Sequence, residues 1–370
     1  MNGHRLLLLG SIWGTLLVSS VLADKVDDAV QKGVKFLVSC QSEQLGAFNP
    51  PDRNVRFAAQ NSYPMTALAI MAMASVGHQP TDPGEVGEAM SKGIEFLLRN
   101  DPRRSRARGY YGTDGSRMYG HGITTLCLSE VLGMAVSRDQ DRRIRAALVP
   151  AVNLILAAQR SRKFDARHVG GWRYEPHSND SDISISVWQL MALRSAQNAG
   201  IRVPKQNIDL AIRYLERSYL SGRNARDEPT NLKSGFGYTP TSRRPGFATT
   251  SAGLLSLQVC NRIDAPEVIG AANWLEDYDV RPSDRWFYYG AYYYSQGMQK
   301  RKDSDPDSPG SRQARLARET IERIMLNLQK ANGSWDATNG NERGVGQVYC
   351  SSLAILSLSV KYHFLPIYQH

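Results

Sequence analysis

The sequence predicts an all-α protein in which about six helical hairpins close into an (α/α)6 toroid, an inner ring of helices inside an outer ring. Apolar helical segments rich in small residues recur along the chain, and an amphipathic helix precedes each of them. The alternating pattern typical of strands is nearly absent. The recurring segments align at spacings of 58, 62, 65, 40 and 60 residues when the following positions are taken as equivalent: Thr66, Thr124, Ser186, Ser251, Ala291 and Ser351.

The amphipathic segments are expected to form the outer ring. In the fourth of them, Ile208, Ala211, Ile212 and Leu215 recur at the spacing that places side chains on one helix face. One apolar face covers the inner ring while the polar face meets solvent. We predict outer helices over residues 26–40, 86–98, 144–159, 208–219, 266–275 and 315–329.

The mostly apolar segments are expected to form the inner ring, because a helix that is apolar on all sides is buried on all sides. They lie within residues 64–77, 123–135, 185–196, 249–260, 288–298 and 349–360. Inner helices of successive hairpins run parallel, so their N-termini should meet at one mouth of the ring.

The connectors carry a second repeat, in which a Gln is followed by Gly and then by an aromatic residue. A Gln amide can cap a neighbouring helix end while the aromatic ring stacks over it, and Gly permits the positive φ of a tight turn. We interpret these motifs as structural staples of the ring. They occur at Gln41, Gly46 and Phe48, at Gln159, Gly170 and Trp172, and at Gln329, Gly333 and Trp335, with reduced versions at 109–112 and 235–238.

The N-terminus resembles a secretory signal over residues 1–23, which leaves one toroid domain over residues 24–370. Arg5 precedes an apolar run over 6–23, and Val21 and Ala23 are small residues suited to a signal-peptidase site. An uncleaved anchor is the alternative, since the run is about long enough to span a bilayer. Both interpretations place the protein outside the cytoplasm, in the periplasm or the extracellular space.

The composition narrows the class further. The 370 residues carry a net charge of +10 and are 42% hydrophobic, which excludes a disordered chain. A basic exported protein is expected to meet anionic membrane surfaces, wall polymers or glycans rather than nucleic acid. The sequence lacks CxxC, HExxH and phosphate-loop motifs, so we expect no cofactor and no metal. Disulfides and buried free thiols both stay open for Cys40, Cys127, Cys260 and Cys350.

The Gln-Gly-Trp repeat and the hairpin period resemble the terpenoid cyclase and protein prenyltransferase superfamily, on its squalene–hopene cyclase side, over residues 24–370. The run Asp180-Ser181-Asp182-Ile183 looks like the acidic DxDD motif of that family. The resemblance implies Asp182 as proton donor to an alkene and Asp180 as its supporting carboxylate. Ile183 replaces the last Asp of the motif, and the start of a helix equally suits Asp as an N-cap. The zinc ligands of the prenyltransferase branch are missing, because Trp286 stands where that branch requires a Cys.

Further candidates lie at the starts of inner helices and along the fifth one. His121 begins the second inner helix and is expected at the same mouth as Asp182, where it could partner a carboxylate. Aromatic rings of the fifth inner segment could stabilise a carbocation, stack on sugar rings or fill the core. The candidate ligand-binding residues are Trp188, Trp286, Tyr288, Tyr289, Tyr292 and Tyr293.

Three functions are consistent with these patterns. The first is binding or cyclising an isoprenoid lipid with Asp182 as general acid. The second is an exported polysaccharide lyase or glycoside hydrolase on a helical toroid. The third is a non-catalytic binding or scaffold module, favoured by the incomplete acidic motif. The second hypothesis uses Tyr119, His121, Arg173, Asp180 and Asp182.

Overall fold

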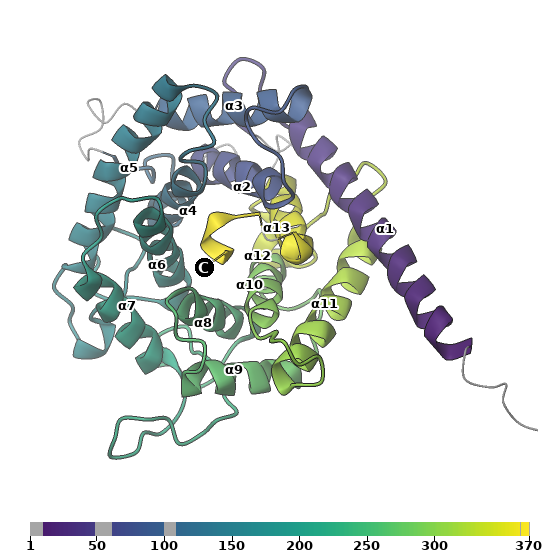
Figure 1. The fold of residues 1–370 in the computed structure, drawn as a ribbon. Coiled ribbons are helices and arrows are strands. Elements are labelled where there is room, and N and C mark those ends of the chain that lie inside the picture. Colours follow the sequence, from purple (N-terminus) through teal and green to yellow (C-terminus); the bar gives the residue numbers. More distant parts are fainter. Residues whose placement is uncertain (1–9, 49–60, 100–108, 363, 370) are drawn as a thin grey trace, which may run out of the picture.

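A computed structural model describes residues 10–48, 61–99, 109–362 and 364–369, with side chains from residue 25 onward (Figure 1). Regular structure within these residues is helical, accompanied by three isolated β-bridges. The outer ring consists of α1 (Gly10–Ser39), α3 (Glu85–Leu98), α5 (Arg138–Gln159), α7 (Lys205–Ser218), α9 (Pro266–Glu276) and α11 (Pro309–Leu328). The inner ring consists of α2 (Ser62–Ser75), α4 (Arg117–Glu130), α6 (Ile183–Asn198), α8 (Phe247–Val259), α10 (Phe287–Gln299) and α13 (Gln347–Leu358). The predicted all-α toroid is thereby confirmed.

The two rings differ in burial as the sequence patterns predict. In α7 one face is buried, through Ile208, Ala211 and Leu215, while the opposite face is exposed. In α2 every residue from Pro64 to Ser75 is buried, because the helix is enclosed by its neighbours in the ring. Burying an apolar side chain completely stabilises the fold by about 1.5–3 kcal/mol, so the inner ring supplies much of the driving force for folding.

The ring closes between the two ends of the chain. Helix α13 packs beside α2, and α11 packs beside α1 (Figure 1). The side-chain amide of Gln329 donates to the carbonyl of Ala29 at 2.7 Å and to that of Gly333 at 3.0 Å. The last staple motif therefore holds the first outer helix.

The same staple recurs within the ring. The amide of Gln159 donates to the carbonyls of Gly170 and Asn207, both at 2.9 Å, and so joins the end of α5 to α7. The indole N–H of Trp172 donates to the carbonyl of Ile155 at 2.9 Å. Gln41 makes the equivalent bonds to Gly46 and Ala89, each at 2.8 Å.

The long connectors gather at one mouth of the ring. Each runs from an outer helix to the next inner helix, so each reaches the end where inner helices begin, which we call the N-terminal mouth. The connectors back to the outer ring are shorter. The long connectors span residues 40–61, 99–116, 160–182, 219–246, 277–286 and 329–346, of which 49–60 and 100–108 lie outside the described residues.

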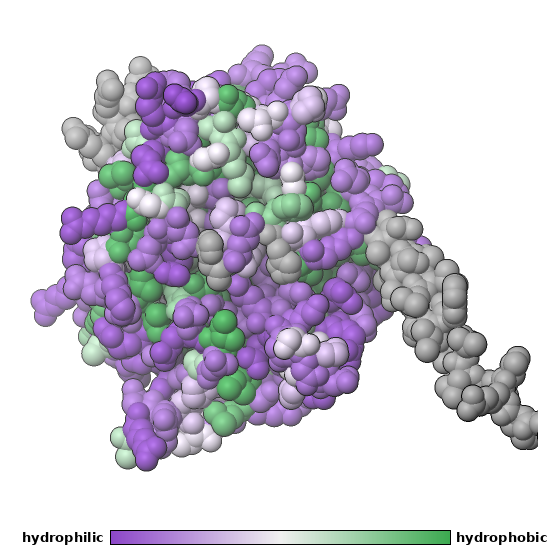
Figure 2. Space-filling model, viewed as in Figure 1, coloured by the Kyte–Doolittle hydropathy of each residue, from purple (hydrophilic) through white to green (hydrophobic). Residues whose placement is uncertain are grey.

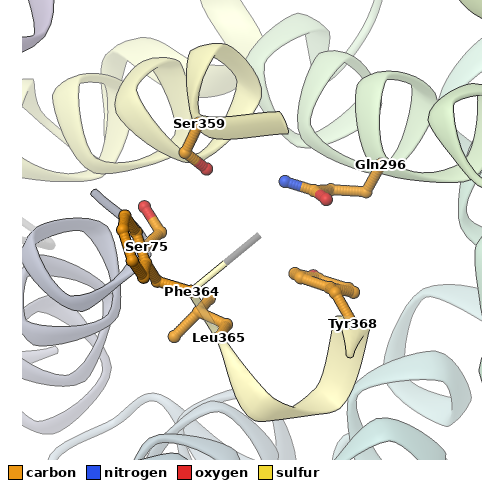
Figure 3. A pocket seen from close by; sticks show the side chains of 6 residues that line it. All are labelled: Ser75, Gln296, Ser359, Phe364, Leu365 and Tyr368. Atoms are coloured by element: carbon orange, nitrogen blue, oxygen red, sulfur yellow. The ribbon is translucent and has the colours of Figure 1, made fainter. Parts of the chain in front are cut away.

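The C-terminal segment occupies the opposite mouth, at the centre of the ring (Figure 1). It contains the short helix η3 (Pro366–Tyr368), whose Ile367 donates its backbone N–H to Glu130 at 3.1 Å. The hydroxyl groups of Tyr368 and Tyr292 are hydrogen-bonded. A shallow pocket beside this segment is lined by Ser75, Gln296, Ser359, Phe364, Leu365 and Tyr368 (Figure 3).

Two further observations concern surface and cysteines. The face seen in Figure 2 is mainly hydrophilic, with apolar residues scattered in small groups. Among the described helices, none combines the length and apolar character that crossing a bilayer requires. All four cysteines, Cys40, Cys127, Cys260 and Cys350, are buried and free.

Candidate functional site

Asp182 lies at the N-terminal mouth as the N-cap of α6. Its side chain is fully buried, and its Oδ1 accepts hydrogen bonds from the N–H of Ile185 at 3.0 Å and the hydroxyl of Ser184 at 2.6 Å. Its own backbone N–H donates to the carbonyl of Trp172 at 3.0 Å. The staple motif of this hairpin thus positions Asp182, and one carboxyl oxygen is used as a helix cap.

Arg173 joins the two candidate carboxylates. Its Nη1 lies 3.1 Å from Oδ2 of Asp182, and its Nε lies 3.4 Å from Oδ2 of Asp180. The guanidinium also lies over the rings of Tyr174 and Tyr238, at 4.8 and 5.5 Å from their centroids. The hydroxyls of these two tyrosines are 2.6 Å apart. These five residues form what we call the Arg173 cluster.

Burial governs the electrostatics of the cluster. It raises the pKa of Asp182, an effect opposed by the hydrogen bonds from Ser184 and Ile185 and by the positive charge of Arg173. Burial and the negative charge of Asp182 raise the pKa of Tyr238, so this phenol keeps its proton. The cluster therefore combines two carboxyl groups, one permanent cation and two phenols that can donate hydrogen bonds.

Two more tyrosines extend the cluster across the mouth. The hydroxyl of Tyr119, on α4, lies 2.5 Å from Oγ of Ser184, and that of Tyr289, on α10, donates to the carbonyl of Ser184 at 3.5 Å. Burial raises the pKa of Tyr119 well above its usual range, and the charge of Asp182 adds to this. Side chains from α4, α6 and α10 thus meet beside Asp182.

Most of the predicted aromatic ligand residues lie in the core. Trp188 stacks on Tyr292 with ring centroids 6.0 Å apart and meets Tyr293 edge-on at 5.5 Å, and Tyr292 and Tyr293 are 4.7 Å apart. Tyr288 is also buried and donates its hydroxyl to the carbonyl of Asp336 at 2.8 Å. The rings of Trp188, Tyr292 and Tyr293 therefore pack against one another in the core. Nearer the mouth, Trp286 is 36% exposed.

His121 is turned away from the Arg173 cluster. Its Nδ1 accepts the backbone N–H of Tyr111 at 3.3 Å, and its Nε2 lies 3.1 Å from the carbonyl of Ala151. Burial lowers its pKa to about 4, so the ring is neutral at pH 7. The structure therefore does not bring His121 to Asp180 or Asp182, and both ring nitrogens serve the backbone.

Tyr174 and Tyr238 belong to the Arg173 cluster, although neither was among the candidate site residues predicted from the sequence. Each stands two positions after the aromatic residue of a staple, Trp172 in one case and Phe236 in the other. An aromatic residue at this offset is the signal that could have identified them. The aromatic residue of the staple is buried in the core, whereas the residue two positions later lies back at the N-terminal mouth.

Proteins of known structure that share this fold include enzymes with different activities. No protein-family model matches the chain, and no curated protein matches it. Among solved structures, the α-1,6-mannanase GH76A of Salegentibacter sp. HEL1_6 aligns with a TM-score of 0.62 and 9% identity, over 92% of this chain and 99% of that one. A variant of the type II terpene cyclase MstE from Scytonema, with geranylgeranyl dihydroxybenzoate bound, aligns with a TM-score of 0.53 and 13% identity, over 92% and 98%.

A glycosidase variant aligns with a TM-score of 0.54 and 14% identity, over 94% of this chain and 99% of that chain. At such identities the likeness concerns the fold alone. The resemblance to terpenoid cyclases seen in the sequence therefore holds at the level of an α/α toroid, which glycosidases share with the terpene cyclase.

Proposed function

We propose that the N-terminal mouth binds a carbohydrate chain and that Asp182 and Asp180 are its candidate acid and base for glycoside hydrolysis. The observation that carries this proposal is the Arg173 cluster, in which one guanidinium holds two carboxylates and lies over two tyrosine rings. Tyr238 is 38% exposed and Arg173 and Asp180 are partly exposed, so a ligand can reach these three members of the cluster, while Asp182 is buried beneath Arg173.

The chemistry of a sugar matches this surface. A sugar ring offers an apolar face that stacks on an aromatic ring, and hydroxyl groups that bond to carboxylates and to a guanidinium. Glycosidases act through paired carboxyl groups, of which the acid has a raised pKa. Burial raises the pKa of Asp182, and Asp180 is the more exposed of the two.

The test uses purified protein with α-1,6-mannotriose and α-1,6-mannotetraose, because the mannanase neighbour was solved with such ligands. Calorimetry measures binding, and release of reducing sugar measures hydrolysis. The net charge of +10 leads us to add acidic glycans and anionic lipid vesicles to the panel.

We expect Asp182→Asn to bind glycan and to lose turnover by a factor of about 100 or more. The matched control is Asp209→Asn, which removes a carboxylate that pairs with Lys205 on the outer surface of α7. Turnover in Asp182→Asn equal to that of the wild type contradicts the catalytic assignment. Binding by the wild type without turnover supports the scaffold function, and absence of binding across the panel contradicts the carbohydrate proposal.

A second candidate function is binding or cyclising an isoprenoid, with Asp182 as the general acid. The raised pKa of this buried carboxyl favours it, since protonating an alkene demands an acid that has kept its proton. Mass spectrometry of organic extracts tests it, with Ala291→Trp as the variant that places a larger side chain at a buried position of α10. An isoprenoid retained by the wild type and lost in the variant supports this candidate. Absence of lipid from both proteins contradicts it.

A further inference from the structure

Unusual backbone geometry marks two residues at the N-terminal mouth. Among the described residues, four other than glycine have φ between 56° and 61°: Arg117, Asp227, Asn261 and Trp286. Asn and Asp enter this left-handed region readily, whereas a bulky side chain such as Trp or Arg enters it at a cost in free energy. Both bulky residues stand where an inner helix begins. Such strain persists only where the surrounding structure holds it.

Trp286 is held by the connector between α11 and α13, through Glu342 and Asn339. The buried carboxylate of Glu342 accepts the N–H groups of Tyr288 and Tyr289, at 2.9 and 3.3 Å, and so fixes the first turn of α10. On the other side of Trp286, the amide of Asn339 donates to the carbonyl of Asp284 at 2.8 Å. The backbone is therefore bound on both sides of Trp286, while its own side chain stays 36% exposed.

Arg117 borders the Arg173 cluster directly. The N–H of Met118, the next residue, donates to the carbonyl of Tyr174 at 3.0 Å. The guanidinium of Arg117 lies 3.2 Å from a carboxylate oxygen of Glu175, and both side chains are more than half exposed. An exposed ion pair of this kind adds little stability, so it does not account for the strained backbone.

Trp286 is connected to the cluster through α10. Tyr289, one turn further along the helix, donates to the carbonyl of Ser184, and the hydroxyl of Ser184 donates to Asp182. The start of α10 and the start of α4 therefore both adjoin the residues around Asp182. Arg117 thus adjoins the site that the proposed function uses, and Trp286 stands one turn before Tyr289, which contacts that site through Ser184.

We infer that Trp286 and Arg117 are ligand-contacting residues of the carbohydrate site, with Glu342 as the positioning residue for Trp286. The inference rests on the proposed function and extends it by two contacts. The indole of Trp286 would stack on a sugar ring, and the guanidinium of Arg117 would donate hydrogen bonds to sugar hydroxyls or to an acidic substituent. Stored backbone strain then serves binding and lowers the stability of the free protein.

Substitution by glycine separates the contribution of the side chain to binding from the cost of backbone strain, because glycine adopts positive φ without strain. We expect Trp286→Gly to keep or raise Tm and to weaken binding of α-1,6-mannotetraose about tenfold or more. Arg117→Gly should likewise keep or raise Tm, and its affinity for α-1,6-mannotetraose should fall about threefold or more. Asp227→Gly is the matched control, since it relieves the same conformation on an exposed turn and should leave affinity unchanged.

Trp286→Asn provides a second variant, which removes the ring but still suits the left-handed conformation. A lower Tm with unchanged affinity in both Trp286 variants would show a structural role and overturn the inference. A wild type that binds while Trp286→Gly and Arg117→Gly bind equally well overturns this inference alone. A wild type that binds none of the glycans overturns the proposed function, and the inferred contacts with it.

Discussion

The backbone N–H of Tyr111 donates to Nδ1 of His121. In this second hairpin His121 is therefore the acceptor for the staple N–H, a role that a side-chain hydroxyl takes in four other hairpins. In each of those hairpins the N–H of the staple aromatic residue donates to a Ser or Thr on the following inner helix, at 2.9–3.1 Å. His121 is thus a member of the structural repeat. The acceptors in the other hairpins are Thr66, Ser186, Thr250 and Ser351.

The role of His121 predicts a loss of stability in acid. Its pKa is lowered by burial to about 4 in the folded protein, against about 6.5 in an unfolded chain. The neutral ring therefore stabilises the fold above pH 6.5, and this contribution, about 3 kcal/mol, is lost as the pH falls towards 4. His121→Gln keeps an acceptor and a donor without titrating, so its free energy of unfolding should vary less over this range. Urea unfolding at pH 7 and pH 4.5 measures the difference.

His177→Gln serves as control for this experiment, since His177 is exposed. The control should follow the wild type at both pH values. Equal pH dependence in His121→Gln and the wild type would contradict the assignment.

Glu130 predicts the opposite dependence on pH. Burial raises its pKa to about 7, while its carboxylate accepts the N–H of Ile367 and the hydroxyl of Ser195. A carboxyl whose pKa is raised on folding stabilises the protein below about pH 4.5, and this stability is lost as the pH rises through 7. Glu130→Gln cannot ionise, and the Ser195 hydroxyl can turn to accept from the new amide. Its free energy of unfolding should exceed that of the wild type by about 1–3 kcal/mol at pH 8.

Denaturant midpoints at pH 4.5 and pH 8 test this prediction. The exposed Glu43→Gln is the control and should match the wild type at both values. Part of the wild-type slope should survive in Glu130→Gln, because burial also raises the pKa of Glu342 to about 7. A variant less stable than the wild type at pH 8 would show that Glu130 holds the C-terminal segment as a carboxylate.

The close approach of Gly170 to α7 predicts that a side chain at this position destabilises the protein. Its φ is +95°, and a Cβ there would lie 2.2 Å from the carbonyl oxygen of Leu210. Gly200 also has a positive φ, +74°, but a Cβ there would meet nothing within 4 Å. Gly200→Ala should cost about 1 kcal/mol from conformation alone. Gly170→Ala should cost about 3 kcal/mol or more, since α7 must also move.

Unfolding by guanidinium chloride measures both glycine variants against the wild type. Similar losses of stability in the two variants would mean that the close contact between Gly170 and α7 adds nothing to the free-energy cost of the substitution. A larger loss in Gly170→Ala alone supports the close contact.

The N-terminal residues predict processing on export. Among the side chains that the structure describes in α1, those of Val26, Ala29 and Val30 are buried, and the carbonyl of Ala29 accepts the ring-closing bond from Gln329. A chain beginning at Asp24 keeps all of these contacts, so removal of residues 1–23 should leave the free energy of unfolding within about 0.5 kcal/mol. Mass spectrometry of the exported protein should find Asp24 first. A retained Met1 would favour an uncleaved anchor instead.

Patterns in the sequence were sufficient to predict the helices and the staples of the fold. Periodicity predicted an outer helix over 208–219, and α7 spans Lys205–Ser218. The Gln-Gly-aromatic motifs predicted the staples at Gln159 and Gln329, because a motif that recurs at the same point of several hairpins indicates contacts between neighbouring hairpins. Asp182 was recognisable as a helix start, since a capping residue acts on the backbone next to it.

The set of side chains that meet at the N-terminal mouth depends on how the hairpins pack together, which sequence patterns do not report. Tyr174 and Tyr238 are 64 residues apart in the sequence. Their hydroxyls meet because the connectors of two neighbouring hairpins lie side by side. Tyr292 and Tyr293 lie within α10, in which every residue from Phe287 to Met298 is buried. Trp286 belongs to the same aromatic run, but it precedes the helix with a left-handed backbone and is 36% exposed. Helical periodicity reports which residues share a face. The direction of that face depends on the closure of the ring, which residues 300 positions apart complete through Gln329 and Ala29.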